Sequence, residues 1–259
     1  MTTKPAKQRW FRKFPSTKAP RVTLYCFPYG GSGPSIFREW SDQLGDDIEV
    51  VGVLYPGRES RVLEPLLPDI VEIARAMAAS VVPDLRQPFA FYGHSMGALI
   101  SYELARILGA EHGLMPRHLF VSGAGAPHVP TEEPIHHLPD EEFLQALIDL
   151  NGMPQAVLDN RSLLEYALPI IRNDFKACAE YRYLDGPSVT CPLTAMGGTD
   201  DPRVREEHVT LWNEYTPAAF QARIFPGDHF FLGPQEAAIL KLIQQELAEN
   251  TTEAVVGSQ

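Results

Sequence analysis

The sequence contains few cysteines and no long apolar segment, and both absences restrict its class. Three cysteines occur in 259 residues, an odd number without metal-site spacing, so we expect reduced thiols at Cys26, Cys178 and Cys191. No apolar run is long enough to span a bilayer, and the first 18 residues lack the apolar core of a secretory signal. We therefore expect a cytoplasmic protein that contacts no membrane and holds no metal.

Positive charge is also scarce. The chain has 22 Lys and Arg residues against 33 Asp and Glu residues, and its net charge of −11 argues against general nucleic-acid binding. Seven of the basic residues lie within residues 1–21, which contain no acidic residue. We therefore predict a basic N-terminal arm over residues 1–20, which either meets an acidic partner protein or remains a solvated tail.

Predicted strands and helices alternate along the chain. Short apolar runs that end in turn residues predict strands, and apolar residues at helical spacing predict helices. This alternation is typical of an α/β fold with a mainly parallel sheet flanked by helices. The predicted strands are 21–27, 48–54, 88–92, 118–122, 192–196 and 220–225, and the predicted helices are 36–44, 69–82, 98–108, 204–215 and 235–247.

The segment 127–187 interrupts this alternation with two or three helical patterns. Connections between strand and helix usually run about 2–6 residues, so we interpret the segment as an inserted helical lid. Ligands bind at the carboxyl edge of open α/β sheets, and we expect the lid to cover that edge. The core is then 21–126 and 188–249, with a frayed tail over 250–259. Residues that would line a pocket under the lid, or pack within it, are Leu147, Leu150, Met153, Leu168, Phe175, Tyr181 and Tyr183.

The segment Gly93-His94-Ser95-Met96-Gly97 lies between a predicted strand and a predicted helix. A G-x-S-x-G sequence in that context is typical of a nucleophile elbow, a sharp turn that exposes the serine hydroxyl. Gly93 and Gly97 allow the strand and the helix to approach closely. We therefore predict Ser95 as a catalytic nucleophile.

A serine nucleophile needs an imidazole as base and a carboxylate that orients the imidazole. In α/β-hydrolases these follow the serine in the order acid, then histidine. Among eight histidines, His229 alone follows a late strand and precedes the last helix, so it is the predicted base. Asp200 and Asp201 follow the preceding strand, and only one of them can point at His229. We favour Asp201 and expect Asp200 to cap the next helix.

Hydrolysis of an ester or thioester passes through an oxyanion, which needs two N–H donors. The amide of Met96, after the nucleophile, is one predicted donor. The other is expected at Tyr29 or Gly30, in a glycine-rich loop after the first predicted strand.

Several blocks of the sequence resemble the type II (external, editing) thioesterases that accompany modular polyketide synthases and nonribosomal peptide synthetases. The resemblance covers residues 10–232, and the residue before the histidine, Asp228, departs from the small residue that the family often has there. The matching blocks are Trp10-Phe11-Arg12, Cys26-Phe27-Pro28-Tyr29-Gly30-Gly31, Pro56-Gly57-Arg58-Glu59, Gly93-His94-Ser95-Met96-Gly97-Ala98, Leu138-Pro139-Asp140, Tyr181-Arg182-Tyr183, Gly197-Gly198 with Asp200-Asp201, and Pro226-Gly227 with His229-Phe230-Phe231.

The resemblance implies an α/β-hydrolase fold with a mobile helical lid. It also implies hydrolysis of aberrant or stalled acyl groups from the phosphopantetheine arm of acyl or peptidyl carrier proteins, with no cofactor of the enzyme's own. Carrier proteins are usually acidic, so a local basic patch or the basic arm is expected to meet them. We expect a monomer. A general carboxylesterase, an acyltransferase of the same fold, a chain-releasing thioesterase and a catalytically idle carrier-binding adaptor remain as alternatives.

Overall fold

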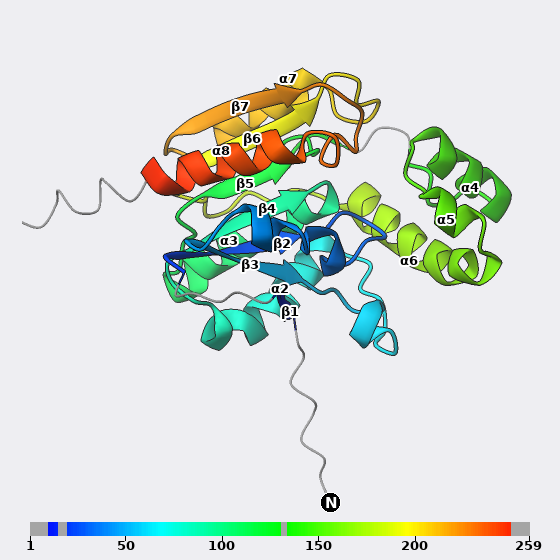
Figure 1. The fold of residues 1–259 in the computed structure, drawn as a ribbon, viewed down its shortest axis with the longest axis horizontal. Coiled ribbons are helices and arrows are strands. Elements are labelled where there is room, and N and C mark those ends of the chain that lie inside the picture. The colour runs from blue at the N-terminus through cyan, green and yellow to red at the C-terminus, as the bar shows by residue number, and fades with distance from the viewer. Residues whose placement is uncertain (1–9, 15–19, 131–133, 250–259) are drawn as a thin grey trace, which may run out of the picture.

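A seven-stranded sheet of order β1-β3-β2-β4-β5-β6-β7 forms the centre of the protein (Figure 1). The computed structural model describes residues 10–14, 20–130 and 134–249. All neighbouring strands are parallel except β1 and β3, so the predicted mainly parallel sheet is confirmed. The strands are β1 (Phe11–Lys13), β2 (Val22–Phe27), β3 (Ile48–Val53), β4 (Phe89–His94), β5 (Leu119–Ser122), β6 (Leu193–Gly198) and β7 (Phe220–Phe225).

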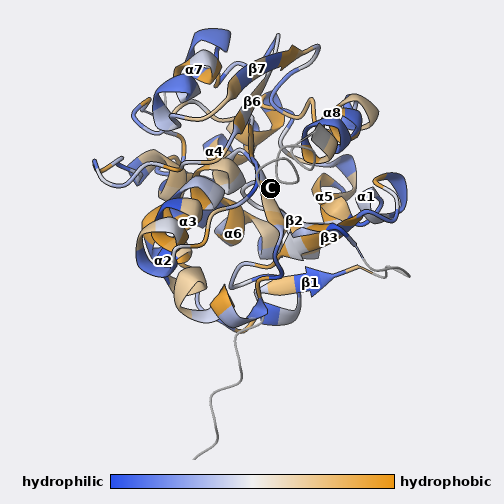
Figure 2. Ribbon diagram, turned by 90° about the vertical axis from the view of Figure 1, so that its left-hand side faces the viewer, coloured by the Kyte–Doolittle hydropathy of each residue, from blue (hydrophilic) through white to orange (hydrophobic). Residues whose placement is uncertain are grey.

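Helices cover both faces of this sheet. Alternate side chains of β2 enter different apolar clusters: Tyr25 and Phe27 pack with helices α2 and α3, whereas Leu24 and Cys26 pack with α1 and α8. Figure 2 shows apolar strands inside and hydrophilic outer faces on α2 and α8. Within the described ranges, no helix has the length and apolarity needed to cross a membrane. The helices around the sheet are α1 (Trp40–Gln43), α2 (Ile70–Val81), α3 (Met96–His112), α7 (Glu206–Thr210) and α8 (Glu236–Glu249), with short 3-10 turns at Pro34–Phe37, Glu59–Arg61, Val82–Asp84 and Leu211–Tyr215.

Three further helices lie between β5 and β6, within the range predicted as a lid. They are α4 (Asp140–Asp149), α5 (Gln155–Leu158) and α6 (Arg161–Glu180), and they gather at one end of the sheet (Figure 1). Phe143, Leu147, Met153 and Ile171 form a buried cluster of their own there. Part of the insertion therefore packs on itself, whereas Ala177 and Tyr181, at the end of α6, belong to the main apolar core. The insertion lies at the carboxyl end of the parallel strands (Figure 1).

The N-terminal segment differs from the predicted arm. Residues 11–13 form β1, which pairs antiparallel with β3, and the flanking Trp10 and Phe14 are buried. Their apolar side chains leave water and fix this part of the segment to the sheet, so the predicted boundary after residue 20 is wrong for residues 10–14. Other predicted parts of the arm and the tail lie outside the described residues: 1–9, 15–19 and 250–259.

Candidate active site

Ser95 occupies the sharp turn between β4 and α3. Its backbone angles, φ 54° and ψ −119°, belong to a region that residues other than glycine rarely adopt. The neighbouring glycines make the turn feasible, because a Cβ on Gly97 would lie 2.1 Å from the carbonyl oxygen of Phe27, and one on Gly93 would lie 2.2 Å from that of Gly97. The Ser95 amide donates to the carbonyl of Ser122 at 2.7 Å. This geometry is that of a nucleophile elbow.

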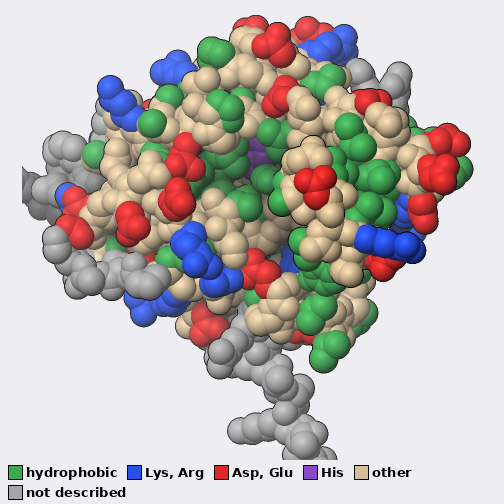
Figure 3. Space-filling view, turned by 45° about the vertical axis from the view of Figure 1, so that its right-hand side comes forward, with side chains coloured by type: hydrophobic (Ala, Val, Ile, Leu, Met, Phe, Trp, Pro, Cys, Tyr) green, Lys and Arg blue, Asp and Glu red, His purple; other side chains and the backbone are tan. Residues whose placement is uncertain are grey.

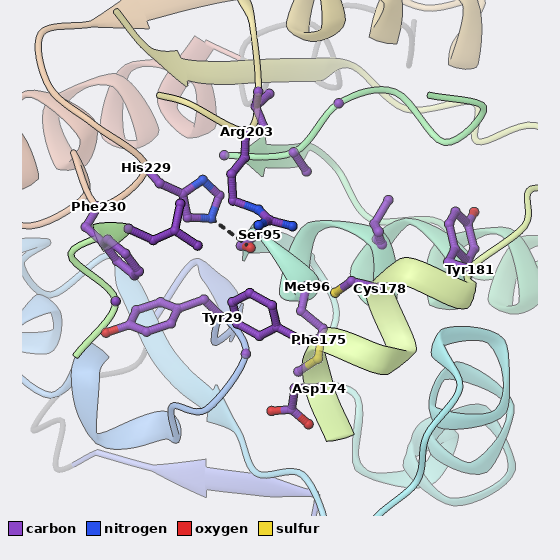
Figure 4. A pocket seen from close by; sticks show the side chains of 18 of the residues that line it. Tyr29, Ser95, Met96, Asp174, Phe175, Cys178, Tyr181, Arg203, His229 and Phe230 are labelled. Carbon is purple, nitrogen blue, oxygen red and sulfur yellow. Dashed lines mark hydrogen bonds between the residues drawn. The ribbon is translucent and has the colours of Figure 1, made fainter. Parts of the chain in front are cut away.

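The side chains of Asp201, His229 and Ser95 form a hydrogen-bonded chain. His229 Nε2 lies 3.0 Å from Ser95 Oγ (Figure 4), and His229 Nδ1 lies 2.7 Å from Asp201 Oδ2. Because a carboxylate can only accept, Nδ1 carries the proton and Nε2 is free to receive the serine proton. The three residues follow β6, β7 and β4 respectively, so the parallel sheet brings them to one edge.

Asp201, and not Asp200, contacts the imidazole. The Asp201 side chain is fully buried, and its other oxygen, Oδ1, accepts two backbone amides at 2.8 and 3.1 Å. Burial raises the pKa of this carboxyl, but the hydrogen bond from His229 and its charge, with the two amides, outweigh burial and lower the pKa overall. Asp200 is exposed and accepts from the Thr199 hydroxyl at 2.7 Å. It does not cap α7, whose N-cap residue is Arg205, so that expectation is wrong.

Asp228, the departure from the family pattern, makes its hydrogen bonds with groups other than the imidazole of His229. Its Oδ2 accepts from Asn151 Nδ2 at 2.9 Å, and its Oδ1 accepts from the amide of Phe230 at 2.8 Å. Both carboxylate oxygens are thus used outside the chain of hydrogen bonds that ends at Ser95.

Backbone amides predicted to hold an oxyanion lie beside Ser95. Met96 is the first residue of α3, so its N–H lies in the first turn of the helix, where no carbonyl four residues earlier is available. Tyr29 and Gly30 follow β2 and line the same pocket as Ser95 and Met96. The positions suit two converging donors, and the choice between Tyr29 and Gly30 as the second donor stays a prediction.

A pocket extends from Ser95 between the sheet edge and the inserted helices. Figure 3 shows a hollow on this face with a histidine at its bottom and apolar side chains around it. In Figure 4 the rings of Tyr29 and Phe230 lie on one side of Ser95, and Cys178 lies on the other. Burial raises the pKa of the Cys178 thiol to about 12, so the thiol stays protonated near neutral pH and does not compete as a nucleophile.

Part of the predicted pocket lining is found there. Leu147, Leu150, Phe175 and Tyr181 line the pocket. Met153 and Leu168 instead pack in the apolar cluster of the insertion, and the Tyr183 ring lies 5.2 Å from that of Tyr215.

Arg203 was not anticipated at the site. Among the described residues that line the pocket, it is the one Lys or Arg. Its guanidinium lies 5.3 Å from the centre of the Phe175 ring, and Figure 4 shows it reaching from the Asp201 loop toward Ser95. In the sequence, only its position two residues after Asp201 indicates that Arg203 lies at the site.

Comparison with known proteins agrees with this geometry. The thioesterase domain family model matches residues 22–247. The chain belongs to the thioesterase family. Among the described residues, no group of three or more His, Cys, Asp or Glu side chains is placed to hold a metal ion.

Individual relatives match this thioesterase along most of its length. Linear gramicidin dehydrogenase LgrE of Brevibacillus parabrevis is 42% identical, over 92% of each chain. Among solved structures, RedJ, a thioesterase from the prodiginine pathway of Streptomyces coelicolor, is 37% identical with a TM-score of 0.84, covering 90% of this chain and 89% of its own. The type II thioesterase BorB from the borrelidin biosynthetic cluster is 35% identical with a TM-score of 0.85, covering 92% and 97%. The predicted α/β-hydrolase fold and the resemblance to type II thioesterases are confirmed.

His94, inside the elbow, forms a hydrogen bond with the backbone of the catalytic His229. Its Nε2 lies 3.0 Å from the carbonyl oxygen of His229, and its Nδ1 lies 2.9 Å from Ser122 Oγ. Since the carbonyl can only accept, Nε2 carries the proton and Nδ1 accepts from the Ser122 hydroxyl. Complete burial, together with the charge of His229, lowers the pKa of His94 to about 3.

The free energy of unfolding should therefore fall on acidification. The pKa of His94 is lower in the folded protein than in the unfolded chain, where it is near 6.5. The contribution of His94 to the free energy of unfolding is therefore complete above pH 6.5 and is lost as the pH falls toward 3. Over that range one proton taken up only by the unfolded chain costs about 1.4 kcal/mol per pH unit. Urea unfolding of the wild type and of His94→Gln at pH 7.5, 5.5 and 4.5 should show the steeper loss in the wild type. Equal slopes would contradict the prediction. Burial also lowers the pKa of His118, to about 4, but this residue contributes to both proteins alike.

Proposed function

We propose that this thioesterase is an editing enzyme that hydrolyses aberrant or stalled acyl groups from the phosphopantetheine arm of acyl or peptidyl carrier proteins. The observation that carries the proposal is the hydrogen-bonded chain from Asp201 through His229 to Ser95 at the bottom of an apolar pocket. RedJ is a thioesterase from the prodiginine biosynthetic pathway, and BorB is a type II thioesterase from the borrelidin biosynthetic cluster. Both relatives support an acyl thioester of a biosynthetic pathway as the class of substrate.

In the first half of the reaction, Ser95 Oγ attacks the thioester carbonyl while its proton passes to His229 Nε2. The carbonyl electron pair moves to the oxygen, where the amide of Met96 and a second amide at Tyr29 or Gly30 stabilise the negative charge. The carbon–sulfur bond then breaks, and the departing sulfur takes the proton from His229. A thiol with a pKa of about 8.5 leaves readily, so less assistance is needed than for an amine.

In the second half, a water molecule attacks the acyl-serine ester. His229 accepts the water proton and then returns it to Ser95 Oγ as the ester bond breaks. The products are a carboxylic acid and a carrier with its free thiol. Asp201 keeps the imidazole in one tautomer during both halves and stabilises its charged form.

The apolar lining suits an enzyme that accepts many acyl groups. One added or missing methylene changes binding in an apolar pocket by only about 1–3 kcal/mol, so discrimination between acyl chains is weak. Editing requires this breadth, because stalled groups differ in structure.

We further propose that an acidic carrier protein is the partner and that the enzyme acts as a monomer without a cofactor of its own. Of the N-terminal bases, Arg12 forms an ion pair with Glu59 and Lys13 lies 3.7 Å from Glu49. These two charges are partly neutralised within the protein, so the carrier would meet other bases of the segment or a patch near the pocket.

The geometry of the site argues against one alternative reaction and leaves two others to be tested. The name of LgrE denotes a dehydrogenase, but dehydrogenation needs no serine nucleophile, and the triad geometry favours hydrolysis. A general carboxylesterase or an acyltransferase would use the same triad, so these two need an experimental distinction.

Mass spectrometry of a carrier protein loaded with acetyl, hexanoyl or aminoacyl groups tests the proposal. We expect wild-type enzyme to restore the free thiol of each carrier and release the carboxylic acid, and we expect Ser95→Ala to leave the carriers loaded. Running the reaction in ¹⁸O-labelled water without an added acceptor identifies water as the nucleophile.

Matched acyl-CoA and simple ester substrates complete the experiment. Faster turnover of the simple esters than of the loaded carriers would assign a carboxylesterase instead. Release of the acyl group only when an alcohol or amine acceptor is present would assign an acyltransferase. Turnover that survives Ser95→Ala would remove the basis of the mechanism.

A further inference from the structure

A buried ion pair outside the triad joins the inserted helices to the core. Arg58, after β3, donates from Nη1 to Asp174 Oδ2 at 2.7 Å and from Nη2 to Asp174 Oδ1 at 2.9 Å. The two side chains are 6% and 1% exposed. A bidentate pair of this kind fixes both distance and orientation, because two parallel hydrogen bonds resist rotation. The sequence gives no hint of it, since 116 positions separate the partners.

The same pair holds the loop that carries the predicted oxyanion donors. The amide of Gly31 donates to Asp174 Oδ2 at 2.7 Å, and Arg58 Nη1 also donates to the carbonyl of Ser32 at 3.1 Å. A Cβ placed on Gly30 would lie 3.2 Å from Asp174 Cβ, so the carboxylate residue also packs against the loop backbone. Two peptide groups of the loop, Gly30–Gly31 and Ser32–Gly33, are thereby fixed, and the first of them directly follows Gly30.

Helix α6 packs against this loop next to the ion pair. Asp174 lies on α6 and lines the pocket, and Ile171, one turn earlier, lies close enough that a Cβ on Gly31 would be 2.5 Å from its Cγ1. Only a glycine leaves room for the helix there, and its φ of +81° suits glycine as well. The loop conformation therefore depends on α6 being seated.

We propose that Arg58 and Asp174 are positioning residues that make the oxyanion hole conditional on the seating of α6. The inference rests on the proposed function. Oxyanion donors act only when they are aimed before the charge develops. With the pair intact, the peptide groups after Gly30 are held in one orientation. When α6 moves away, the Gly31 amide loses its acceptor, and Arg58 loses the partner that fixes it against Ser32. An open pocket would then admit substrate without hydrolysing it.

The test measures kcat and KM on an acyl-pantetheine thioester for Asp174→Asn, Arg58→Lys and Arg58→Met. Loss of one oxyanion donor costs about 10²–10³ in kcat, and we expect a misaligned loop to cost at least about tenfold with KM changed less than about threefold. Affinity for a boronic acid that forms a tetrahedral adduct with Ser95 should fall in parallel with kcat. Affinity for the unreactive amide analogue of the substrate should not change. The double variant Arg58→Met/Asp174→Asn should be no slower than the worse single variant.

Arg172→Met is the matched control. Arg172 lies on the same helix, donates to the carbonyls of His136 and Leu138 at 2.6 and 2.7 Å, and ties α6 to the rest of the insertion rather than to the loop. We expect its kcat to stay within about twofold of wild type, because the contacts of Asp174 remain.

Three results would overturn the inference: unchanged kcat in folded Asp174→Asn and Arg58→Lys, a loss confined to KM, or an equal loss of kcat in Arg172→Met. Circular dichroism and urea unfolding establish folding. If Arg58→Met does not fold, Arg58→Lys, which keeps the charge and loses the bidentate geometry, decides the outcome. A wild-type enzyme without turnover would contradict the proposed function, whereas turnover insensitive to these variants would contradict only this inference.

Discussion

Replacing Asp201 by asparagine is expected to lower kcat on an acyl thioester by about 10⁴, because the imidazole would lose the tautomer that the reaction needs. Asp201 Oδ1 already accepts two backbone amides, so an asparagine keeps its oxygen there and turns its NH₂ group toward His229 Nδ1. Nδ1 must then accept, Nε2 carries the proton, and Ser95 has no base. KM should change little, since the pocket keeps its shape.

Asp200→Asn provides the matched control at the adjacent position. Its carboxylate is exposed and bonds to Thr199, so we expect kcat within about twofold of wild type. Steady-state kinetics on both variants, with urea unfolding to establish equal folding, checks the pair. Similar losses in the two variants would mean that the acid has been assigned wrongly.

Replacing Gly97 by alanine is expected to lower the free energy of unfolding by about 3 kcal/mol or more. The new Cβ would lie 2.1 Å from the carbonyl oxygen and 2.6 Å from the carbonyl carbon of Phe27, in the backbone of β2. A side chain could rotate away from such a clash, but a central strand bonded on both sides cannot move without breaking its ladder. Domains are stable by only about 5–15 kcal/mol, so the variant should unfold at markedly lower urea concentration.

Gly233→Ala is the control for this second variant. A Cβ on Gly233 would meet its nearest atom, the carbonyl oxygen of Phe230, at 3.9 Å, which is ordinary contact. We expect its free energy of unfolding within about 0.5 kcal/mol of wild type. Equal urea midpoints for the two variants would show that helix α3 and β2 separate more easily than their packing implies.

Local patterns were sufficient for the strands after β1 and for the positions of Ser95 and His229. Each strand after β1 is a short, mostly apolar segment that ends in a turn, and parallel strands bring their carboxyl ends to one edge. Ser95 and His229 could therefore be assigned from their places after particular strands. The choice of Asp201 over Asp200 required the structure, because it depends on which carboxylate accepts the backbone amides of the loop.

Contacts between distant segments could not be predicted in this way. Strand β1 has only three residues, and its partner lies about 40 positions later, so no pattern within it indicates a strand. The Arg58–Asp174 pair spans the core and the insertion and has no local signature. The pocket lining was predicted only in part, since Met153 and Leu168 have the same apolar character as the residues that face the cavity.

The separate apolar cluster of the insertion has a consequence for how substrate range can diverge. Phe143, Leu147 and Met153 pack within the insertion, so substitutions at these positions leave the two apolar clusters around the sheet unchanged. A chimaera with another insertion would have to retain Ile171 and Asp174, which seat α6 against the glycine loop, and Ala177 and Tyr181, which belong to the main core. Substitutions in the insertion can thus change which acyl groups such enzymes accept while the catalytic residues around Ser95 stay the same.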